Sequence, residues 1–348
     1  MVTKRKAVAL ISGGLDSMLA VRMVQEQGIE VEGINFYTGF CVEGHTHAIR
    51  NHDKKKKKRN NALWVAEQLG IKLHIIDVIE EYKDIVINPK HGYGAHLNPC
   101  LDCKGFMVRK AEEWRITNNF DFIITGEVVG QRPMSQTAKR MPIVMRESGA
   151  GNRLVRPLCA RKLEATLPEL EGWLDRSKLG EISGRSRKEQ IALTRQWGIK
   201  DYAQPAGGCC FLTNQQYAAK LQDLWTSRGT REYELDDIML LKVGRHIRPN
   251  ADFKLIVCRD DGENNFATGY KNRFISLYAN SHEGPLALFD GQASTENLKL
   301  AARIVARYGK GKHASVVTVQ VSEPRESEGQ ELNVTPLDTT EMPREWIL

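Results

Sequence analysis

The chain has 348 residues, of which 41% are hydrophobic and 27% charged, and it carries a formal net charge of +7. That length suffices for two domains with a core in each, and the composition is typical of a globular protein. No stretch approaches the roughly 20 apolar residues that span a bilayer, which excludes a membrane-embedded class. The N-terminus runs directly into an apolar segment with no room for a signal peptide, so a cytoplasmic location is expected. The positive charge favours a polyanionic partner.

A glycine turn near the N-terminus is the first element with chemical content. An apolar run at 7–11 and an amphipathic segment at 18–27 enclose the hexapeptide Ser12-Gly13-Gly14-Leu15-Asp16-Ser17. This order predicts a strand, a tight turn and a helix whose free amides face an anion such as a phosphate. A carboxylate beside a phosphate is repulsive unless a cation lies between them, so Asp16 indicates a magnesium ion.

The rest of the first half alternates between two periodicities. Strands are expected at 30–36, 72–78 and 120–125, and helices at 60–69 and 105–118. This alternation predicts an α/β fold with a doubly wound parallel sheet. Ligands bind at the carboxyl ends of such strands, where Asn35, Phe36 and Gly126 also fall.

The second half has a different pattern. A mainly helical stretch at 163–200, a linker at 204–208 and a helix at 217–225 are expected first. A second, smaller α/β domain follows, with a helix at 295–308 and strands at 253–258, 285–289 and 315–321. From residue 323 the chain is polar and acidic, which predicts a loose tail. The expected domains are 1–160, 161–232 and 233–322, followed by the tail 323–348.

The chain has seven cysteines, and in a reducing cytosol clustered cysteines indicate a metal site or catalysis. Cys100 and Cys103 form a CxxC motif just before a predicted helix, whose amides are expected to lower the pKa of both thiols. Cys209 and Cys210 follow a Gly-Gly turn. Two thiolates from one loop and one from the other leave three alternatives: a [4Fe-4S] cluster with one open iron, a zinc site completed by His96, or a persulfide carrier with a resolving thiol. The isolated cysteines receive no role: Cys41, Cys159 and Cys258.

These motifs carry a family resemblance. The hexapeptide resembles the SGGxDS signature of the PP-loop ATP pyrophosphatases, which cleave ATP between the α and β phosphates and adenylate a carbonyl oxygen. With the NPCLDC motif at 98–103 and the GGCCFLT motif at 207–213, residues 5–225 resemble the tRNA thiouridylases that make 2-thiouridine. Residues 125–136 are similar to the nucleotide loop of 4-thiouridine synthetase-like proteins. The C-terminal domain resembles an RNA-binding domain of NFACT type.

The resemblance implies an ATP-dependent tRNA sulfurtransferase that adenylates a uridine carbonyl and replaces its oxygen with sulfur. By the match, Cys103 and Cys210 take the catalytic positions, with Asp16 at the phosphates. Cys100 stands where many of these enzymes have Asp, which favours the three-cysteine members that hold an iron–sulfur cluster, with Cys209 as the alternative to Cys210. The implied ATP-binding residues are Ser12, Gly13, Gly14, Asp16, Ser17, Asn35, Phe36, Gly126 and Gln131.

The implied cofactors are ATP, Mg²⁺ and a [4Fe-4S] cluster, with zinc as the second choice. The implied partners are tRNA and a sulfide or persulfide donor, and a homodimer stays open. A basic run predicts contacts to tRNA phosphates: Lys54, Lys55, Lys56, Lys57, Lys58 and Arg59. Two other functions stay open. One is a PP-loop synthetase or amidotransferase that acts on a small molecule and has a structural metal on its cysteines. The other is a non-catalytic RNA-binding protein that senses ATP, against which the intact Asp16 and Ser17 argue.

Overall fold

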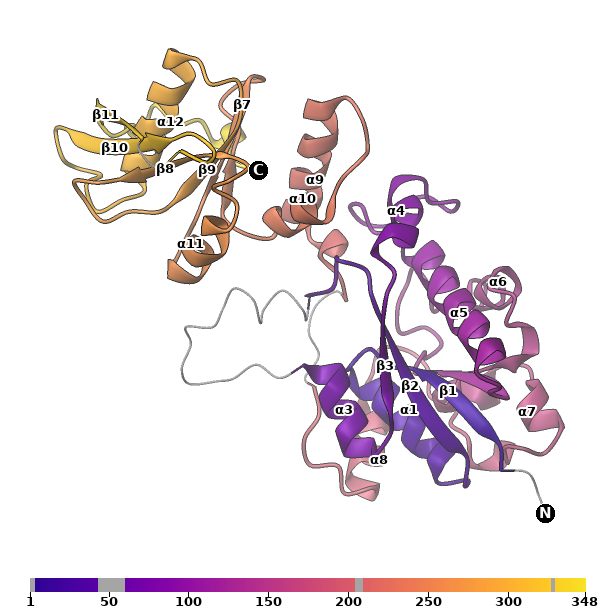
Figure 1. The fold of residues 1–348 in the computed structure, drawn as a ribbon. Helices are drawn as coiled ribbons and strands as arrows, with labels where there is room; N and C mark the ends of the chain where they lie inside the picture. Colours follow the sequence, from indigo (N-terminus) through magenta and orange to yellow (C-terminus); the bar gives the residue numbers. More distant parts are fainter. Residues whose placement is uncertain (1–3, 43–59, 204–208, 327–328) are drawn as a thin grey trace. The chain divides into compact units, whose positions relative to one another are not determined.

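The computed structural model describes residues 4–42, 60–203, 209–326 and 329–348. The chain divides into two compact units (Figure 1): the first comprises Met1–Thr38 and Arg59–Cys209, and the second Gly39–Lys58 and Cys210–Leu348. The expected helical segment 161–232 is therefore not a body of its own. Its residues up to Cys209 fold with the first unit, and the remainder folds with the second.

The first unit contains a five-stranded sheet. Its strands are β1 (Lys6–Leu10), β2 (Glu30–Tyr37), β3 (Leu73–Asp77), β4 (Phe122–Thr125) and β5 (Leu154–Val155). All pairings are parallel, and the order is β3-β2-β1-β4-β5 (Figure 1). This order confirms the predicted doubly wound parallel sheet. Leu10 lies opposite both Ile34 and Thr125, so the loops after β1, β2 and β4 leave the same edge of the sheet.

Helices cover both faces of this sheet. α1 (Leu15–Gln25) and α3 (Asn61–Leu69) pack on one face, and α4 (Ile79–Ile87) and α5 (Cys100–Thr117) lie on the other (Figure 1). α3 shows why the sequence signals worked. The Asn60 side chain accepts hydrogen bonds from two amides of the first turn, and Gly70 ends the helix in the left-handed conformation at φ 62°.

The stretch 163–200 differs from the prediction of a mainly helical segment. It contains two short helices, α7 (Leu167–Leu170) and α8 (Lys188–Gln196), and a 3-10 turn at Arg176–Lys178. Glycines interrupt it, because Gly172 and Gly184 adopt left-handed backbone angles of φ 68° and 83°. A helix missed by the sequence reading, α6 (Met141–Glu147), precedes this stretch.

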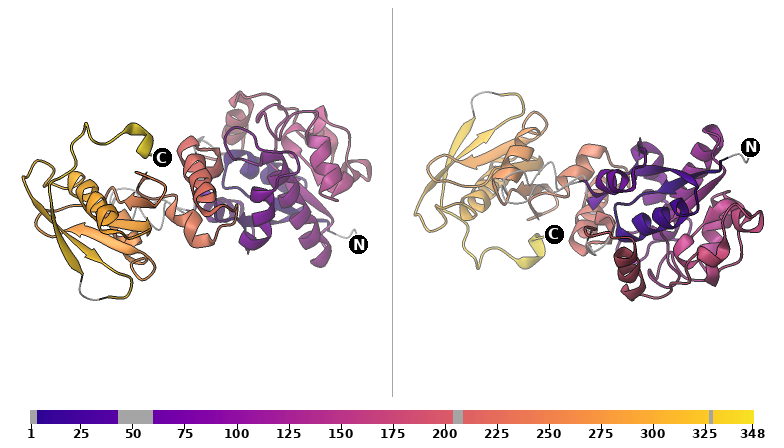
Figure 2. Two further views of the ribbon diagram at one scale, coloured as in Figure 1. Left: turned by 90° about the horizontal axis from the view of Figure 1, so that it is seen from above. Right: turned by 90° about the horizontal axis from the view of Figure 1, so that it is seen from below.

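The second unit is built on a separate antiparallel sheet. In the order β11-β10-β8-β9-β7-β6, its strands are Gln330–Val334, Val317–Ser322, Ile275–Ala279, Ala287–Gly291, Phe253–Val257 and Arg245–Ile247. α12 (Thr295–Arg307) packs against this sheet (Figure 2), and α11 (Asp261–Thr268) lies between β7 and β8 in the chain. None of the described helices in either unit is long and apolar enough to span a bilayer.

The prediction of a loose tail from residue 323 is wrong. β11 pairs with β10 from Gln330 opposite Val321 to Val334 opposite Val317, and Val334 and Leu337 are buried in the core of this unit. Two of the few apolar residues in this polar segment, Val334 and Leu337, are buried in this core, so composition alone did not reveal the strand.

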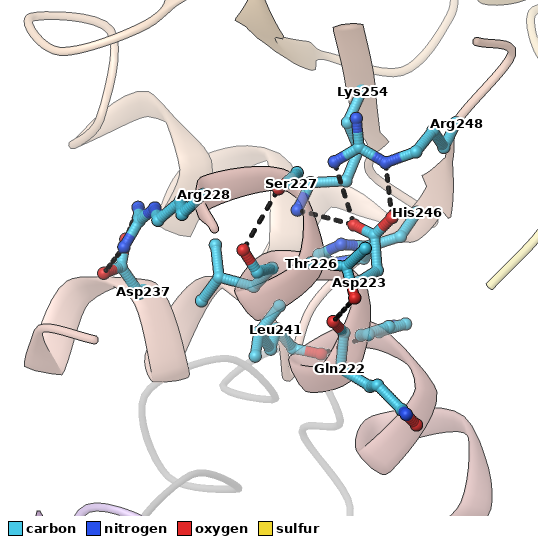
Figure 3. Close-up of polar contacts among 12 residues, drawn as sticks. Gln222, Asp223, Thr226, Ser227, Arg228, Asp237, Leu241, His246, Arg248 and Lys254 are labelled. Carbon is cyan, nitrogen blue, oxygen red and sulfur yellow. Dashed lines mark hydrogen bonds and ion pairs between the residues drawn. The ribbon is translucent and has the colours of Figure 1, made fainter. Parts of the chain in front are cut away.

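Helices α9 (Gln215–Arg228) and α10 (Leu235–Leu240) fold with this second sheet. Asp223 of α9 pairs with Arg248, whose Nη2 lies 3.0 Å from Oδ2, and with Lys254 of β7, whose Nζ lies 3.4 Å from the same oxygen (Figure 3). The Lys254 side chain is only 2% exposed. A buried lysine needs a counter-charge, so this contact ties α9 to the sheet.

Candidate functional site

The hexapeptide forms the turn between β1 and α1, as predicted. Gly13 adopts φ +76°, and a Cβ atom there would lie 2.7 Å from the Cβ of Asn61, so the turn needs glycine for both conformation and space. Gly14 is the N-cap of α1. The buried Ser17 hydroxyl donates to the Gly14 carbonyl over 2.8 Å, and the Gly14 amide donates to Ser12 Oγ over 3.4 Å. The result is a compact turn at a helix N-terminus, which is suited to an anion.

Asp16 lies in the first turn of α1 with one oxygen held and one unpartnered. Its Oδ2 accepts a hydrogen bond of 2.9 Å from Nε2 of Gln131, which the sequence reading also assigned to the nucleotide. Its Oδ1 is buried and has no hydrogen-bond partner among the described residues. A buried carboxylate oxygen without a partner is costly. The donor set therefore fits a cation such as Mg²⁺ beside a phosphate.

Two more predicted residues lie against this turn. Gly126, after β4, lies so close that a Cβ atom there would be 2.5 Å from the carbonyl carbon of Asp16 and the nitrogen of Ser17. The Asn35 side chain donates to the Ile11 carbonyl over 2.7 Å and so ties β2 to the start of the turn. Phe36 is buried in the first unit. The adenine contact expected of Asn35 and Phe36 stays a prediction.

A buried ion pair that sequence reasoning missed lies behind Gly126. Glu127 Oε2 accepts from Arg156 Nε at 3.1 Å and from Thr125 at 3.0 Å, and both charged side chains are at most 2% exposed. Burial by itself raises the pKa of Glu127, but the cations Lys104 and Arg156 outweigh it and hold the pKa below its usual value. Glu127 directly follows the predicted Gly126, so its place after a buried strand was the available signal.

The CxxC motif begins α5. Cys100 is the first helical residue after Pro99, and Cys103 lies in the first turn. The loop before the helix is fastened by His91, whose Nδ1 lies 2.9 Å from Asp102 Oδ1 and whose Nε2 lies 3.5 Å from Glu147 of α6. Asp102 also accepts from the His91 amide over 3.0 Å. His96, the expected fourth zinc ligand, is exposed and has a left-handed φ of 62°.

The expectation that helix amides lower the pKa of these thiols is wrong in this arrangement. Burial, and then the neighbouring Cys209, raise the pKa of Cys103 to about 12. The same two causes, in the same order, raise the pKa of Cys100, although the cations Arg132 and Lys104 oppose them. Desolvation at these partly buried thiols therefore outweighs the helix dipole.

These interactions also identify the neighbour of the CxxC motif. Cys209 interacts with both Cys100 and Cys103 within the first unit. Cys210 belongs to the second unit, where it lies opposite Cys41 in an isolated antiparallel bridge. The sequence reading preferred Cys210 as the third thiol, and the alternative, Cys209, is the one that the structure brings to the CxxC motif.

The metal expectations receive no support from these contacts. Across residues 4–42, 60–203, 209–326 and 329–348, no three His, Cys, Asp or Glu side chains are grouped to hold one metal ion. The residues therefore do not fit a [4Fe-4S] cluster or a zinc site in this arrangement. The basic run Lys54–Arg59 lies outside the described residues.

Matches to known protein families cover parts of both units. Residues 5–146 match the family described as tRNA methyl transferase HUP domain, and residues 244–347 match the NFACT protein RNA binding domain. A tRNA-specific 2-thiouridylase of Mesoplasma florum is 25% identical over 70% of this chain and 65% of its own length. A probable tRNA sulfurtransferase of Alkaliphilus oremlandii is 30% identical over 45% of this chain and 36% of its own length.

The matched regions thus span less than two thirds of these curated relatives. Among solved structures, a predicted subunit of tRNA methyltransferase from Methanocaldococcus jannaschii is 13% identical, with a TM-score of 0.35, over 66% of this chain and 92% of its own. The family matches agree with the parallel sheet of the first unit and the separate sheet of the second.

Proposed function

We propose that this chain is an ATP-dependent tRNA sulfurtransferase that converts a uridine of tRNA to thiouridine. The observation that carries the proposal is the pairing, within one unit, of a phosphate-type turn with a CxxC motif that interacts with Cys209. The turn offers helix amides and the unpartnered Asp16 Oδ1. The thiols come from two loops, with Cys100 and Cys103 at the start of α5 and Cys209 beside them. The relatives named as tRNA thiouridylase and tRNA sulfurtransferase support the same chemistry.

In this proposal the turn at Ser12–Ser17 binds the phosphates of ATP, and Asp16 holds Mg²⁺, which would neutralise the charge between carboxylate and phosphate. The uridine carbonyl oxygen attacks the α phosphorus, and pyrophosphate leaves. Adenylation makes that oxygen a good leaving group. Gln131 keeps Asp16 oriented through its hydrogen bond.

Hydrosulfide, released from a cysteine persulfide when a second thiol attacks the inner sulfur and forms a disulfide, then attacks the activated carbon, and AMP departs. If the persulfide attacks the carbon directly, AMP departs first, and a second thiol then breaks the sulfur–sulfur bond to leave thiouridine and a disulfide. The described residues do not group three metal ligands, so this transfer uses thiol chemistry alone. The target base has to leave its stack to be reached, which costs a few kcal/mol. The tRNA contacts are assigned to the NFACT-type residues 244–347 and to the basic run Lys54–Arg59.

The test is thiouridine formation by the full chain with ATP, Mg²⁺, tRNA and inorganic polysulfide as the persulfide donor, measured by mass spectrometry of nucleosides. Asp16→Asn removes the charge that holds the cation, so both AMP and thiouridine formation should fall about tenfold or more, a loss of about 1.4 kcal/mol of transition-state stabilisation. Cys103→Ser should abolish thiouridine formation and leave ATP binding intact.

Two matched substitutions serve as controls. Asp84→Asn changes an exposed carboxylate of α4, and Cys258→Ala changes a buried thiol of the second unit, so neither should alter the product. The proposal would be contradicted if four single variants all thiolated tRNA fully: Cys100→Ser, Cys103→Ser, Cys209→Ser and Cys210→Ser. AMP formation from a small carboxylate or amide without tRNA would instead favour the small-molecule adenylating enzyme.

A further inference from the structure

Cys41 and Cys210 lie opposite each other on two neighbouring segments of the second unit. They are opposite residues of an isolated antiparallel bridge, and the Phe211 amide donates to the Phe40 carbonyl over 2.9 Å. This hydrogen bond joins the residues that flank the bridge, so Cys41 and Cys210 themselves form a non-hydrogen-bonded antiparallel pair. In such a pair the two Cα atoms lie about 4.5 Å apart, and both side chains are on the same face. A disulfide spans Cα separations of about 4.4 to 6.8 Å. Both residues are present as thiols.

Buried aromatic rings hold the Cys41 segment in place. Phe40 is 1% exposed, and its ring makes edge contacts with Tyr217 and Tyr233, at centroid distances of 6.2 and 5.6 Å. Tyr217 belongs to α9, which follows the Cys210 segment directly. The same hydrophobic contact therefore fixes both sides of the thiol pair.

Lys242 connects the two segments from a third direction. Its ammonium donates to the Gly39 carbonyl, two residues before Cys41, and lies 5.2 Å from the ring centre of Phe211, the residue after Cys210. Lys242 is 6% exposed; burial lowers the pKa of Lys242 to about 8, and an electrostatic interaction with Cys41 opposes that shift.

The neighbouring cysteines 209 and 210 thus have different thiol partners. Cys210 has an extended backbone, at φ −141° and ψ 161°, and successive side chains of an extended segment point to opposite sides. Cys209 interacts with the CxxC motif of the first unit, whereas Cys210 faces Cys41. Cys41 is therefore the thiol placed to react with a sulfur carried on Cys210.

We propose that Cys41 is the resolving thiol of this chain, which releases hydrosulfide from a persulfide on Cys210. This rests on the proposed sulfur transfer and adds that a persulfide donor loads Cys210. The Cys41 thiolate attacks Sγ of Cys210, and a Cys41–Cys210 disulfide forms. The sulfur–sulfur bond of the persulfide breaks, and its electron pair leaves with the outer sulfur as hydrosulfide. An external dithiol then supplies two electrons and two protons to reduce the disulfide for the next cycle.

The experiment uses the reduced full chain, loaded anaerobically with inorganic polysulfide and desalted, with no ATP or tRNA. Trypsin separates the relevant thiols, because Cys41 lies in peptide 23–50, the CxxC motif in 91–104, and Cys209 with Cys210 in 201–220. The proposal predicts hydrosulfide release together with a disulfide between peptides 23–50 and 201–220. In Cys209→Ser the same link should persist, which assigns it to Cys210.

Cys41→Ser should retain the persulfide and release hydrosulfide at about one tenth of the normal rate or below. The control Cys258→Ala should behave as the unsubstituted chain. Added dithiothreitol should restore release in Cys41→Ser, because a dithiol can replace the missing thiol but cannot repair a misfolded protein. A link from peptide 201–220 to 91–104 in its place, or equal release by Cys41→Ser, would overturn the inference. Disulfide mapping of the unsubstituted chain needs no variant.

These outcomes separate the inference from the proposed function. If the unsubstituted chain makes no thiouridine but forms the Cys41–Cys210 link with hydrosulfide release, the sulfurtransferase proposal fails and the thiol pair stands. If it makes thiouridine while peptide 23–50 is recovered only as the unlinked thiol, the pair fails and the sulfurtransferase stands. Free sulfide should bypass Cys41 in tRNA thiolation by Cys41→Ser.

Discussion

At the scale of single residues, the turn at Ser12–Ser17 depends on backbone contacts that only glycine permits. Gly126 presses on the first turn of α1. In Gly126→Ala the added methyl group would lie 2.5 Å from backbone atoms of Asp16 and Ser17, so that turn has to shift. We expect ATP affinity to fall about tenfold or more, which isothermal titration calorimetry would measure, with a loss of stability of about 1–3 kcal/mol.

Gly105→Ala is the matched control. Gly105 lies inside α5, and a Cβ atom there meets nothing within 4 Å, so alanine should stabilise the helix by about 0.5–1 kcal/mol. Equal ATP affinity in the two variants would contradict the role given to the contact at Gly126.

The sequence identified the turn because its residues are contiguous and their types are unusual together. It did not identify Lys104, which interacts with Cys100, Cys103 and Glu127, because a lysine one residue after a CxxC motif resembles any helix surface residue. The pairing of Cys41 with Cys210 spans 169 positions of the chain, and no local pattern indicates which segments become neighbours.

At the scale of elements, the elements with strong periodicity agree with the prediction, among them β1, β2, α3 and α12. The failures lie where propensity and composition were weak guides. Glycines interrupt the stretch 163–200. β11 is a strand because it pairs with β10 at the edge of the sheet. Such pairing depends on tertiary contacts, which the sequence of a polar segment does not indicate.

The contact between α9 and the second sheet gives an element-scale prediction. Asp223→Asn removes the counter-charge of Arg248 and of the 2% exposed Lys254 (Figure 3). An uncompensated buried cation is costly, so we expect a loss of about 3–5 kcal/mol in the stability of the second unit. Urea unfolding, followed by Trp225 fluorescence in α9, would measure it.

The control for this prediction is Asp252→Asn, an exposed carboxylate of the same unit, which should change stability by less than about 0.5 kcal/mol. If Asp223→Asn and Asp252→Asn had the same unfolding midpoint, the ion pairs of Asp223 would not stabilise the packing of α9 on the second sheet.

At the scale of the whole molecule, the charge is distributed unevenly between the parts that are assigned to tRNA. Residues 244–347, the NFACT-type region, contain 13 Lys and Arg against 14 Asp and Glu, although the chain as a whole carries +7. The excess positive charge therefore belongs to the other residues, where Lys54–Arg59 is the densest run. Long-range attraction of tRNA should depend more on that run than on the net charge of the NFACT-type region.

This gives a prediction for salt dependence. Replacing Lys54, Lys55, Lys56, Lys57 and Lys58 by Gln in the full chain should weaken tRNA binding and flatten its dependence on salt, because each lost phosphate contact removes about 0.7–0.9 from the slope of log K against log salt. Filter binding at several salt concentrations would measure both. The matched control replaces three exposed lysines of the NFACT-type region, Lys299, Lys310 and Lys312, by Gln. A larger change of slope per charge in that control would reverse the assignment and make the NFACT-type surface the main phosphate contact, since a domain without net charge can still bind RNA through a local basic face.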